Sequence, residues 1–392
     1  METKRVWLLI AAAFLFASMR STSSSAQGNS VGSREDGKRI FQRETFGGNG
    51  RTCLTCHSTG TGTVSPQDAL ERFRKNPRDP LFVHDGSDDG LGHGVNRMLK
   101  DATILIEIPL PPNVSLADDP AARSVILRRG IPTTLNTPAL DRVLMLDGRQ
   151  RDLISQAAGA IRAHYQNTEI PESRDLQRIA EFQVTDAFFS SSNLKSLARG
   201  GSTPILPEVT TESEKRGRLF FEDAPHDPFK GEKHGICAEC HNGPMLNETS
   251  RFNPLPIPIG MRFQSVLVSE INAANNPVRT FIFTNPDGSK TEITSPDPGR
   301  ALITGRSTDD SVQGQPIFNN VNAFKIPTLH GIGRTAPYFH DNSAKTLEDV
   351  AAHYALFFAI VTDLDGPGPE PPTLILTEQD QADIVAFLKL LN

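Results

Sequence analysis

The chain has few cysteines, few tyrosines and almost no tryptophan. Its 392 residues include four cysteines, three tyrosines and one tryptophan, Trp7. All four cysteines fall in two short motifs, so no odd thiol is left over. Long apolar runs are also lacking. The run over residues 6–17 has about a dozen residues and is too short to span a bilayer, so we expect no stable membrane insertion.

The first 26 residues are expected to be a secretory signal peptide. The basic pair Lys4 and Arg5 precedes the apolar run, and the small residues 24–26 follow it at a plausible cleavage point. The mature chain would begin near Gln27, outside the cytoplasm, with the Gram-negative periplasm as the expected setting. It would contain no tryptophan, because Trp7 lies in the leader.

The charge balance of the chain is acidic. The formal net charge of −6 becomes −8 once residues 1–26 are removed, because they carry three basic residues and one acidic residue. A surface of this charge disfavours nucleic acid and anionic membranes as partners.

Two copies of a Cys-x-x-Cys-His motif, at residues 53–57 and 237–241, carry the chemistry of the chain. Two thioether bonds would fix the edge of a c-type haem, and the histidine that follows would be an axial ligand of its iron. Short-loop disulfides do not explain the two histidines. A zinc site would need a second ligand pair near each motif, and the motifs are 184 residues apart. We therefore predict two covalent haems, attached through Cys53, Cys56, Cys237 and Cys240 and ligated by His57 and His241.

Helical periodicity dominates the rest of the chain. Helices are expected over residues 33–42, 150–165, 176–197, 211–221 and 377–388. Residues 102–108 alternate as a strand does, and residues 278–293, with a turn at 285–288, predict a β-hairpin. The predicted fold class is therefore mainly α.

An internal repeat divides the chain in two. Residues 131–165 are echoed by residues 326–354, and in both copies an Ile-Pro-Thr segment is followed later by His-Tyr. The two Ile-Pro-Thr segments are 195 residues apart, which is close to the spacing of the two Cys-x-x-Cys-His motifs. The simplest architecture is two tandem cytochrome c-like domains, residues 27–200 and 201–392, with the hairpin inserted in the second.

Three segments of the second half carry a family resemblance. They are residues 324–329 (Phe-Lys-Ile-Pro-Thr-Leu), 335–341 (Thr-Ala-Pro-Tyr-Phe-His-Asp) and 240–244 (Cys-His-Asn-Gly-Pro). Together with residues 132–156, they resemble the bacterial dihaem cytochrome c peroxidase and MauG family. The resemblance does not extend to residues 58–130 or to the predicted hairpin.

The resemblance implies two packed, mostly helical cytochrome c domains with a calcium ion between them. By position, the calcium ligands would be the side chain of Asn136 and the backbone carbonyls of Thr335 and Pro337. Calcium prefers oxygen ligands of this kind. Asn136 would otherwise serve only to cap a turn.

The resemblance also locates the sixth ligand of the second iron. The peroxidases have a methionine fourteen residues after the histidine of the 335–341 segment, whereas MauG has a tyrosine, and this chain has Tyr354 there. No methionine follows Met261, so the C-terminal segment cannot bring a thioether to that position. We predict Tyr354 as the ligand, with His353 and Met245 as the alternatives.

Two positions depart from the family pattern. Leu146 stands where the family has a tryptophan between its haems, so electrons must pass without a tryptophan radical relay. Gln166 stands where the peroxidases have a glutamate, and an amide cannot transfer a proton at O–O cleavage. His164 would supply that acid/base function, ligate the first iron, or lie on a helix surface. His84 and His93 are further candidates for the distal ligand of the first haem.

These features predict a periplasmic dihaem c-type oxidoreductase. Haem 1, at residues 53–57, would react with H2O2 or O2, and haem 2, at residues 237–241, would exchange electrons with a small cytochrome c or cupredoxin. The missing glutamate and tryptophan leave two alternatives open. One is a dihaem electron carrier without substrate chemistry, and the other is a dihaem oxygenase resembling the rubber oxygenases.

Overall fold

The computed structural model of the chain describes residues 24–222, 233–254, 257–258, 260–309, 318–364 and 374–392. The predicted signal peptide, residues 1–26, lies almost wholly outside these ranges. In the part of the chain that the structure describes, no helix is both long and apolar enough to cross a membrane.

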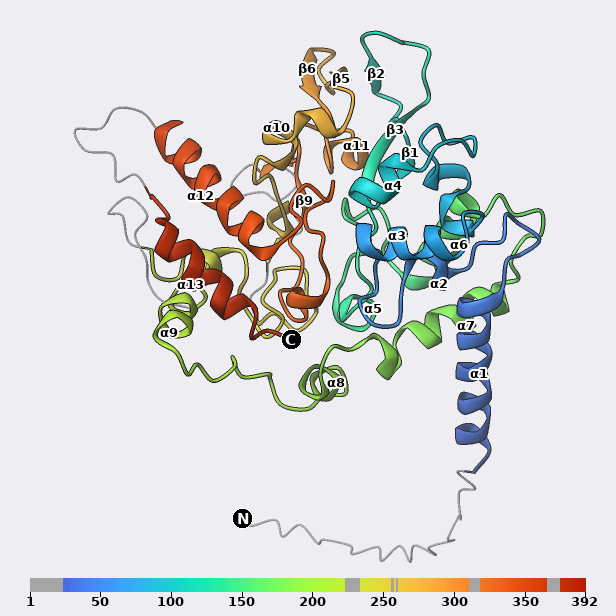
Figure 1. Cartoon of the computed structure of the whole chain (residues 1–392). Helices are drawn as coiled ribbons and strands as arrows, with labels where there is room; N and C mark the ends of the chain where they lie inside the picture. The colour runs from blue at the N-terminus through green and yellow to red at the C-terminus, as the bar shows by residue number, and fades with distance from the viewer. Residues whose placement is uncertain (1–23, 223–232, 255–256, 259, 310–317, 365–373) are drawn as a thin grey trace, which may run out of the picture.

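Helices are the main regular elements (Figure 1). The first half contains α1 (Ser24–Arg43), α2 (Cys53–Cys56), α3 (Pro66–Lys75), α4 (Asn96–Asp101), α5 (Thr137–Leu140), α6 (Leu153–His164), α7 (Ser173–Gln183) and α8 (Ser192–Ala198). The second half contains α9 (Glu212–Leu219), α10 (Val268–Ile271), α11 (Ala301–Thr304), α12 (Leu347–Leu364) and α13 (Glu378–Leu388). Short 3-10 turns lie at Pro80–Phe82, His84–Gly86, Asp186–Phe188, Ile236–Glu239, Gly260–Arg262, Ala273–Asn275 and Ile332–Arg334.

Four small antiparallel sheets complete the described fold. Their strands are β1 (Thr103–Pro109), β2 (Val114–Leu116), β3 (Ser124–Gly130), β4 (Phe263–Gln264), β5 (Arg279–Thr284), β6 (Lys290–Ser295), β7 (Thr308–Asp309), β8 (Phe318–Asn319) and β9 (Phe324–Lys325). The strands pair in the orders β1-β3, β2-β5-β6, β4-β9 and β7-β8.

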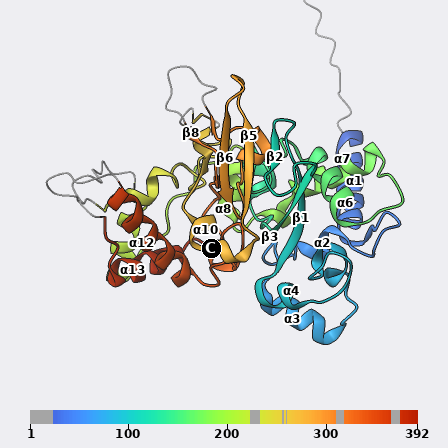
Figure 2. The ribbon, with the colours of Figure 1, turned by 90° about the horizontal axis from the view of Figure 1, so that it is seen from above.

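The hairpin predicted near residues 278–293 is present as β5 and β6, with Phe281 opposite Ile293. It is not confined to the second half, because β5 also pairs with β2, where Leu116 lies opposite Phe281. Figure 2 shows β5 and β6 beside β2, between the two groups of helices. The hairpin therefore joins the two halves of the chain through one sheet.

Residues 58–130, which the family resemblance does not cover, build a core of their own. Buried apolar side chains of α4 and of β1 to β3 pack there together with Phe281 and Phe283 of β5. The strand predicted over residues 102–108 is β1, and its alternate residues Ile104, Ile106 and Ile108 face this core.

Two further cores lie on opposite sides of the molecule (Figure 1). The first joins α1, α6 and α7, with Phe41 and Phe182 in edge contact at 5.4 Å between ring centres. The second joins α9, α12 and α13, with Phe221 against Phe387 at 5.2 Å. The helix predicted over residues 176–197 is instead two helices, α7 and α8, separated by a 3-10 turn.

Buried polar contacts also tie the two halves together. The Arg129 guanidinium pairs with Asp147 at 2.5 Å and with Asp297 at 2.7 Å, and all three side chains are almost wholly buried. Lys325 of the second half pairs with Asp141 of the first at 2.6 Å. The relative position of the halves therefore depends on charges that are shielded from water.

Candidate haem sites

The first Cys-x-x-Cys-His motif forms a single helical turn. Thr52 caps α2, and the backbone N–H of His57 donates to the carbonyl of Cys53 at 2.9 Å. The imidazole Nδ1 of His57 donates to the carbonyl of Gly62 at 2.8 Å. This bond fixes the ring and leaves Nε2 for an iron, which is how proteins commonly orient a ligating histidine.

The second motif repeats this geometry. The backbone N–H of His241 donates to the carbonyl of Cys237 at 2.9 Å, and its Nδ1 donates to the carbonyl of Leu246 at 2.9 Å. In both motifs the accepting carbonyl lies five residues after the histidine. The internal repeat therefore extends to the orientation of both proposed iron ligands.

The protonation states of both motifs suit a haem. Burial raises the pKa of Cys53 to about 11 and the pKa values of Cys237 and Cys240 to about 12, so these sulfurs lie in surroundings that disfavour a thiolate charge. Burial also lowers the pKa of His57 and of His241, which keeps each imidazole neutral, as a metal ligand must be. No two cysteines form a disulfide.

Tyr354 lies beside the second motif. It packs with Cys237 against the core of α9, α12 and α13, and burial raises the pKa of its phenol. None of the hydrogen bonds among the described residues involves its hydroxyl. The alternative ligands are engaged elsewhere, because His353 Nε2 donates to the Val266 carbonyl at 2.7 Å and Met245 is buried in a separate apolar cluster.

The surroundings of the second motif can receive a porphyrin. Phe357 and Phe358 of α12 are half-buried and lie about 6 Å from the Tyr354 ring, at 6.1 and 6.2 Å between centres. A cavity of about 470 Å³ opens against His241 and Leu246. A haem requires apolar surroundings and an imidazole ligand, and the cavity beside His241 together with the half-buried aromatics near Tyr354 fits that requirement.

The first motif is bordered by a buried network of charges. His164, at the end of α6, lies with Nδ1 2.5 Å from the carboxylate of Asp85. Asp85 also pairs with Arg51, which is almost wholly buried two residues before Cys53. The Tyr165 hydroxyl donates to the Cys53 sulfur at 3.3 Å, so both sides of the motif are held by side chains from residues 164–165.

The other distal candidates are exposed or half-buried. Gln166 is exposed and accepts a hydrogen bond from the Asn49 amide at 3.2 Å. His93 is exposed on a loop and pairs with Asp89 at 2.7 Å. His84 is half-buried, with Nε2 3.3 Å from the Ala163 carbonyl. Of these side chains, His164 alone contacts a buried carboxylate.

Asn136, the proposed calcium ligand, is fully engaged with protein groups. Its amide oxygen accepts from the backbone N–H of Ser190 at 2.8 Å, and its amide nitrogen donates to the His330 carbonyl at 3.1 Å. Thr335 donates its hydroxyl to the carbonyl of Ile332 at 3.3 Å. The Asn136 oxygen thus already accepts hydrogen bonds from Ser190, and calcium at these three residues stays a prediction.

Two buried carboxylates were not found by reasoning from the sequence. One is Asp85, which lies in a Gly- and Asp-rich loop and has no motif of its own. The other is Glu248, whose burial raises its pKa to about 7 and whose nearest hydrogen-bond partner is Asn242, directly after His241. A carboxylate a few residues after a haem motif was the available signal for Glu248.

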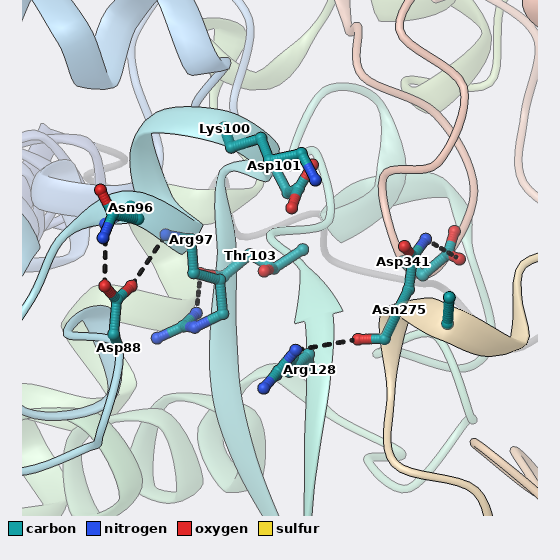
Figure 3. Close-up of a pocket in the computed structure, with 10 residues that line it drawn as sticks. Asp88, Asn96, Arg97, Lys100, Asp101, Thr103, Arg128, Asn275 and Asp341 are labelled. Carbon is teal, nitrogen blue, oxygen red and sulfur yellow. Dashed lines mark hydrogen bonds between the residues drawn. The ribbon is translucent and has the colours of Figure 1, made fainter.

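A polar cavity of about 290 Å³ lies at the junction of the two halves (Figure 3). Lys100, Asp101 and Arg128 line it from the first half, and Asn275 and Asp341 line it from the second. It contains no cysteine or histidine, so it belongs to neither haem site.

Comparison with known proteins identifies relatives for most of the chain. It is 26% identical over 230 residues to a cytochrome c551 peroxidase of Nitrosomonas europaea, covering 55% of each protein. It is 24% identical over 371 residues to the cytochrome-c peroxidase IdrP2 of a Pseudomonas species, covering 91% of this chain and 80% of that one. A crystal structure of a MauG-like protein associated with microbial copper homeostasis is 18% identical, with a TM-score of 0.49 and coverage of 98% of this chain and 95% of that one.

No protein-family model matches the chain. The chain spans little more than half the length of the Nitrosomonas relative. In this chain, His57 and His241 of the two Cys-x-x-Cys-His motifs are oriented alike, each through Nδ1, as two haem-ligating histidines would be. The chain therefore resembles the bacterial dihaem cytochrome c peroxidases, and the relatives named cytochrome c peroxidase support that family.

Proposed function

We propose that the chain is a periplasmic dihaem c-type oxidoreductase with peroxidase-like chemistry. Haem 1 reacts with H2O2 or O2, and haem 2 transfers electrons. The observation that carries the proposal is the matched geometry of the two motifs, in which His57 and His241 each donate Nδ1 to a carbonyl five residues on. The names of the relatives favour peroxide as the oxidant.

The residues of the chain have separate roles in this proposal. When bound, the haems supply one-electron redox chemistry. His57 and His241 hold the irons through Nε2, and Tyr354 completes the second iron through its phenol oxygen. A phenolate stabilises ferric over ferrous iron, so it lowers the potential of haem 2 relative to a thioether ligand. The half-buried aromatic side chains of α12, Phe357 and Phe358, would limit the access of water to that iron.

The architecture and setting form part of the same proposal. We take residues 27–200 and 201–392 as tandem cytochrome c-like domains, exported by a signal peptide and served by a small cytochrome c or cupredoxin. The separate cores around α1 and α13 support two units. Calcium binding at Asn136, Thr335 and Pro337 would require the Asn136 side chain to leave Ser190, and metal analysis of the purified protein tests it.

The first experiment counts the haems. Protein from a strain that matures c-type cytochromes should give two haems per chain in a pyridine haemochrome assay. A Cys237→Ala/Cys240→Ala variant should give one. The half-reduced protein should then consume H2O2 while oxidising a reduced small cytochrome or copper protein. One haem or none in the unaltered chain would refute the proposal.

An electron carrier without substrate chemistry is the second candidate, because Gln166 is exposed and cannot transfer a proton. Carbon monoxide separates the two candidates. An enzyme should bind it at one reduced haem, whereas a carrier with two six-coordinate irons should show no spectral shift in any oxidation state.

A further inference from the structure

The orientation of His164 is set by one carboxylate. Its Nδ1 lies 2.5 Å from Asp85, and Nδ1 must donate because the carboxylate only accepts. The other ring nitrogen, Nε2, has no hydrogen-bond partner among the residues that the structure describes. His164 therefore presents a nitrogen of fixed tautomer and direction, as a histidine does in catalytic triads.

Asp85 is itself held rigidly. It is 4% exposed and pairs with Arg51. Arg51 donates further to the carbonyls of Pro80 and Val83, at 2.9 and 2.7 Å. Burial alone would raise the pKa of Asp85, but the hydrogen bond and charge of His164 and the charge of Arg51 hold it below its usual range. The carboxylate is therefore ionised where it meets the imidazole.

A second arginine fixes the backbone of the same loop. Arg97, buried at the start of α4, donates to the carbonyl of Asp85 at 2.8 Å. Figure 3 shows Arg97 beside Asp88, whose carboxylate accepts from the backbone N–H groups of Asn96 and Arg97 at 3.0 and 2.8 Å. The loop that carries Asp85 is thus anchored by α4 on one side and by Arg51 on the other.

This network lies at the first haem motif. Arg51 stands two residues before Cys53, and Asn49 donates to the backbone carbonyl of His164 at 3.0 Å. Gln166, at the position of the family glutamate, points into solvent.

We propose that Asp85 is a positioning residue that holds His164 through Nδ1, so that His164 Nε2 serves as the acid/base group of haem 1. This inference rests on the proposed function. It also gives residues 58–130 a role, because that segment delivers the carboxylate which Gln166 no longer provides.

The proton balance of the step is simple. With haem 1 bound, Nε2 would accept a proton from one oxygen of H2O2 and return it to the other, which would leave as water as the O–O bond breaks. The remaining oxygen becomes a second water by taking two electrons from the donor protein and two protons from solvent. One H2O2, two electrons and two protons thus give two waters.

The experiment uses HCN, which must give up its proton when cyanide binds to an iron. We would measure the association rate by stopped flow on the half-reduced holoprotein, together with the haem count. His164→Gln should slow association by about 10²–10⁴-fold, the range for a lost acid/base group. Asp85→Asn should slow it by about 10–100-fold, the range for a lost orienting partner.

Further variants separate positioning from folding. The double variant Asp85→Asn/His164→Gln should be no slower than His164→Gln alone, because Asp85 acts through His164. Asp85→Glu keeps the charge opposite Arg51 but moves the carboxylate, so it should retain two haems and still be slow. The matched control is Asp89→Asn, which breaks the exposed pair with His93 on the same loop and should leave the rate unchanged.

Each outcome decides the proposal. Unchanged HCN association in Asp85→Asn and Asp85→Glu, additive effects in the double variant, or a wild type that binds no cyanide in any oxidation state would overturn it. H2O2 turnover measured in parallel tests the proposed function separately. A wild type without turnover whose HCN association still depends on Asp85 and His164 would overturn the peroxidase function and support the positioning role.

Discussion

Replacing Arg129 by methionine should destabilise the protein more than any other single change at the junction of the halves. Arg129 bridges Asp147 of the first half and Asp297 of the second, at 2.5 and 2.7 Å. Asp147 keeps a second partner in Arg149 at 2.8 Å, whereas Asp297 has no other cation among the described ion pairs. The substitution therefore leaves one buried carboxylate unpaired and another half-paired.

The expected loss follows from the burial of these groups. Removing one partner of a buried ion pair typically costs about 3–5 kcal/mol, because the remaining charge is left in a low-dielectric site. For units of roughly 150–250 residues, each kcal/mol lowers the unfolding temperature by about 2–4 °C. Arg129→Met should therefore lower the first unfolding transition of the holoprotein by roughly 6–20 °C.

The loss of stability in Arg129→Met should also depend on pH. Burial alone would raise the pKa of Asp147, but Arg149 and Arg129 hold it below its usual value. A depressed carboxylate pKa adds stability above the unfolded value of about 4, and this stability is lost as the pH falls through the folded pKa. The difference between wild type and Arg129→Met should thus be largest at neutral pH and shrink below about pH 4.

Differential scanning calorimetry of the two-haem protein measures both effects. The matched control is Arg128→Met, one residue earlier on β3, where the side chain is exposed and the expected change is within about 0.5 kcal/mol. Equal unfolding temperatures for Arg129→Met and Arg128→Met would refute the view that this buried charge network holds the halves together.

Three further changes test the two sites. Tyr354→Phe should keep two haems but change the optical and magnetic spectrum of one. The control Tyr338→Phe removes a hydroxyl that donates to a backbone carbonyl and should change neither spectrum. An unaltered low-spin spectrum in Tyr354→Phe would contradict the assignment of Tyr354 as an iron ligand. Glu248→Gln should stabilise the protein by roughly 1–3 kcal/mol at pH 8 in denaturant titrations. Burial raises the pKa of Glu248 to about 7, so the stability of the wild type falls as the pH rises from about 4.5 to 7. A stability difference between variant and wild type that stays constant across this pH range would disprove the charge as its cause. Asn136→Ala should lower the free energy of unfolding by about 2 kcal/mol, because it leaves the Ser190 N–H unpaired and places alanine at a φ of 65°. A loss of bound calcium in the same variant would show that the ion shares this site.

Local features of the fold could be predicted because their partners are close in sequence. The helices expected over residues 211–221 and 377–388 are present, and capping boxes begin them at Thr211 and Thr377, each closing within four residues. The alternation over residues 102–108 correctly gave β1. The helix expected over residues 176–197 was wrong in its continuity, because the apolar spacing carries through a 3-10 turn that ends α7. Spacing alone does not distinguish a continuous helix from two that bury the same side.

The packing of residues 58–130 could not be predicted from the sequence. Their core forms only when β2 pairs with β5, and Val114 then lies opposite Phe283. Such a pairing has no local signal, because each strand is short and its partner is more than 160 residues away. The same holds for Asp85 and His164, which are 79 residues apart and share no motif.

The sequence by itself predicted the covalent chemistry of this protein: two haem motifs, their axial histidines and a resemblance to the dihaem cytochrome c peroxidases. Each motif is one turn of chain, so its geometry depends on bonds between near neighbours such as Cys53 and His57. Only the tertiary structure decided which charges surround each haem and how the halves are joined. Arg129, Asp147 and Asp297 are ordinary charged residues in sequence, and folding makes them a network by removing them from water together.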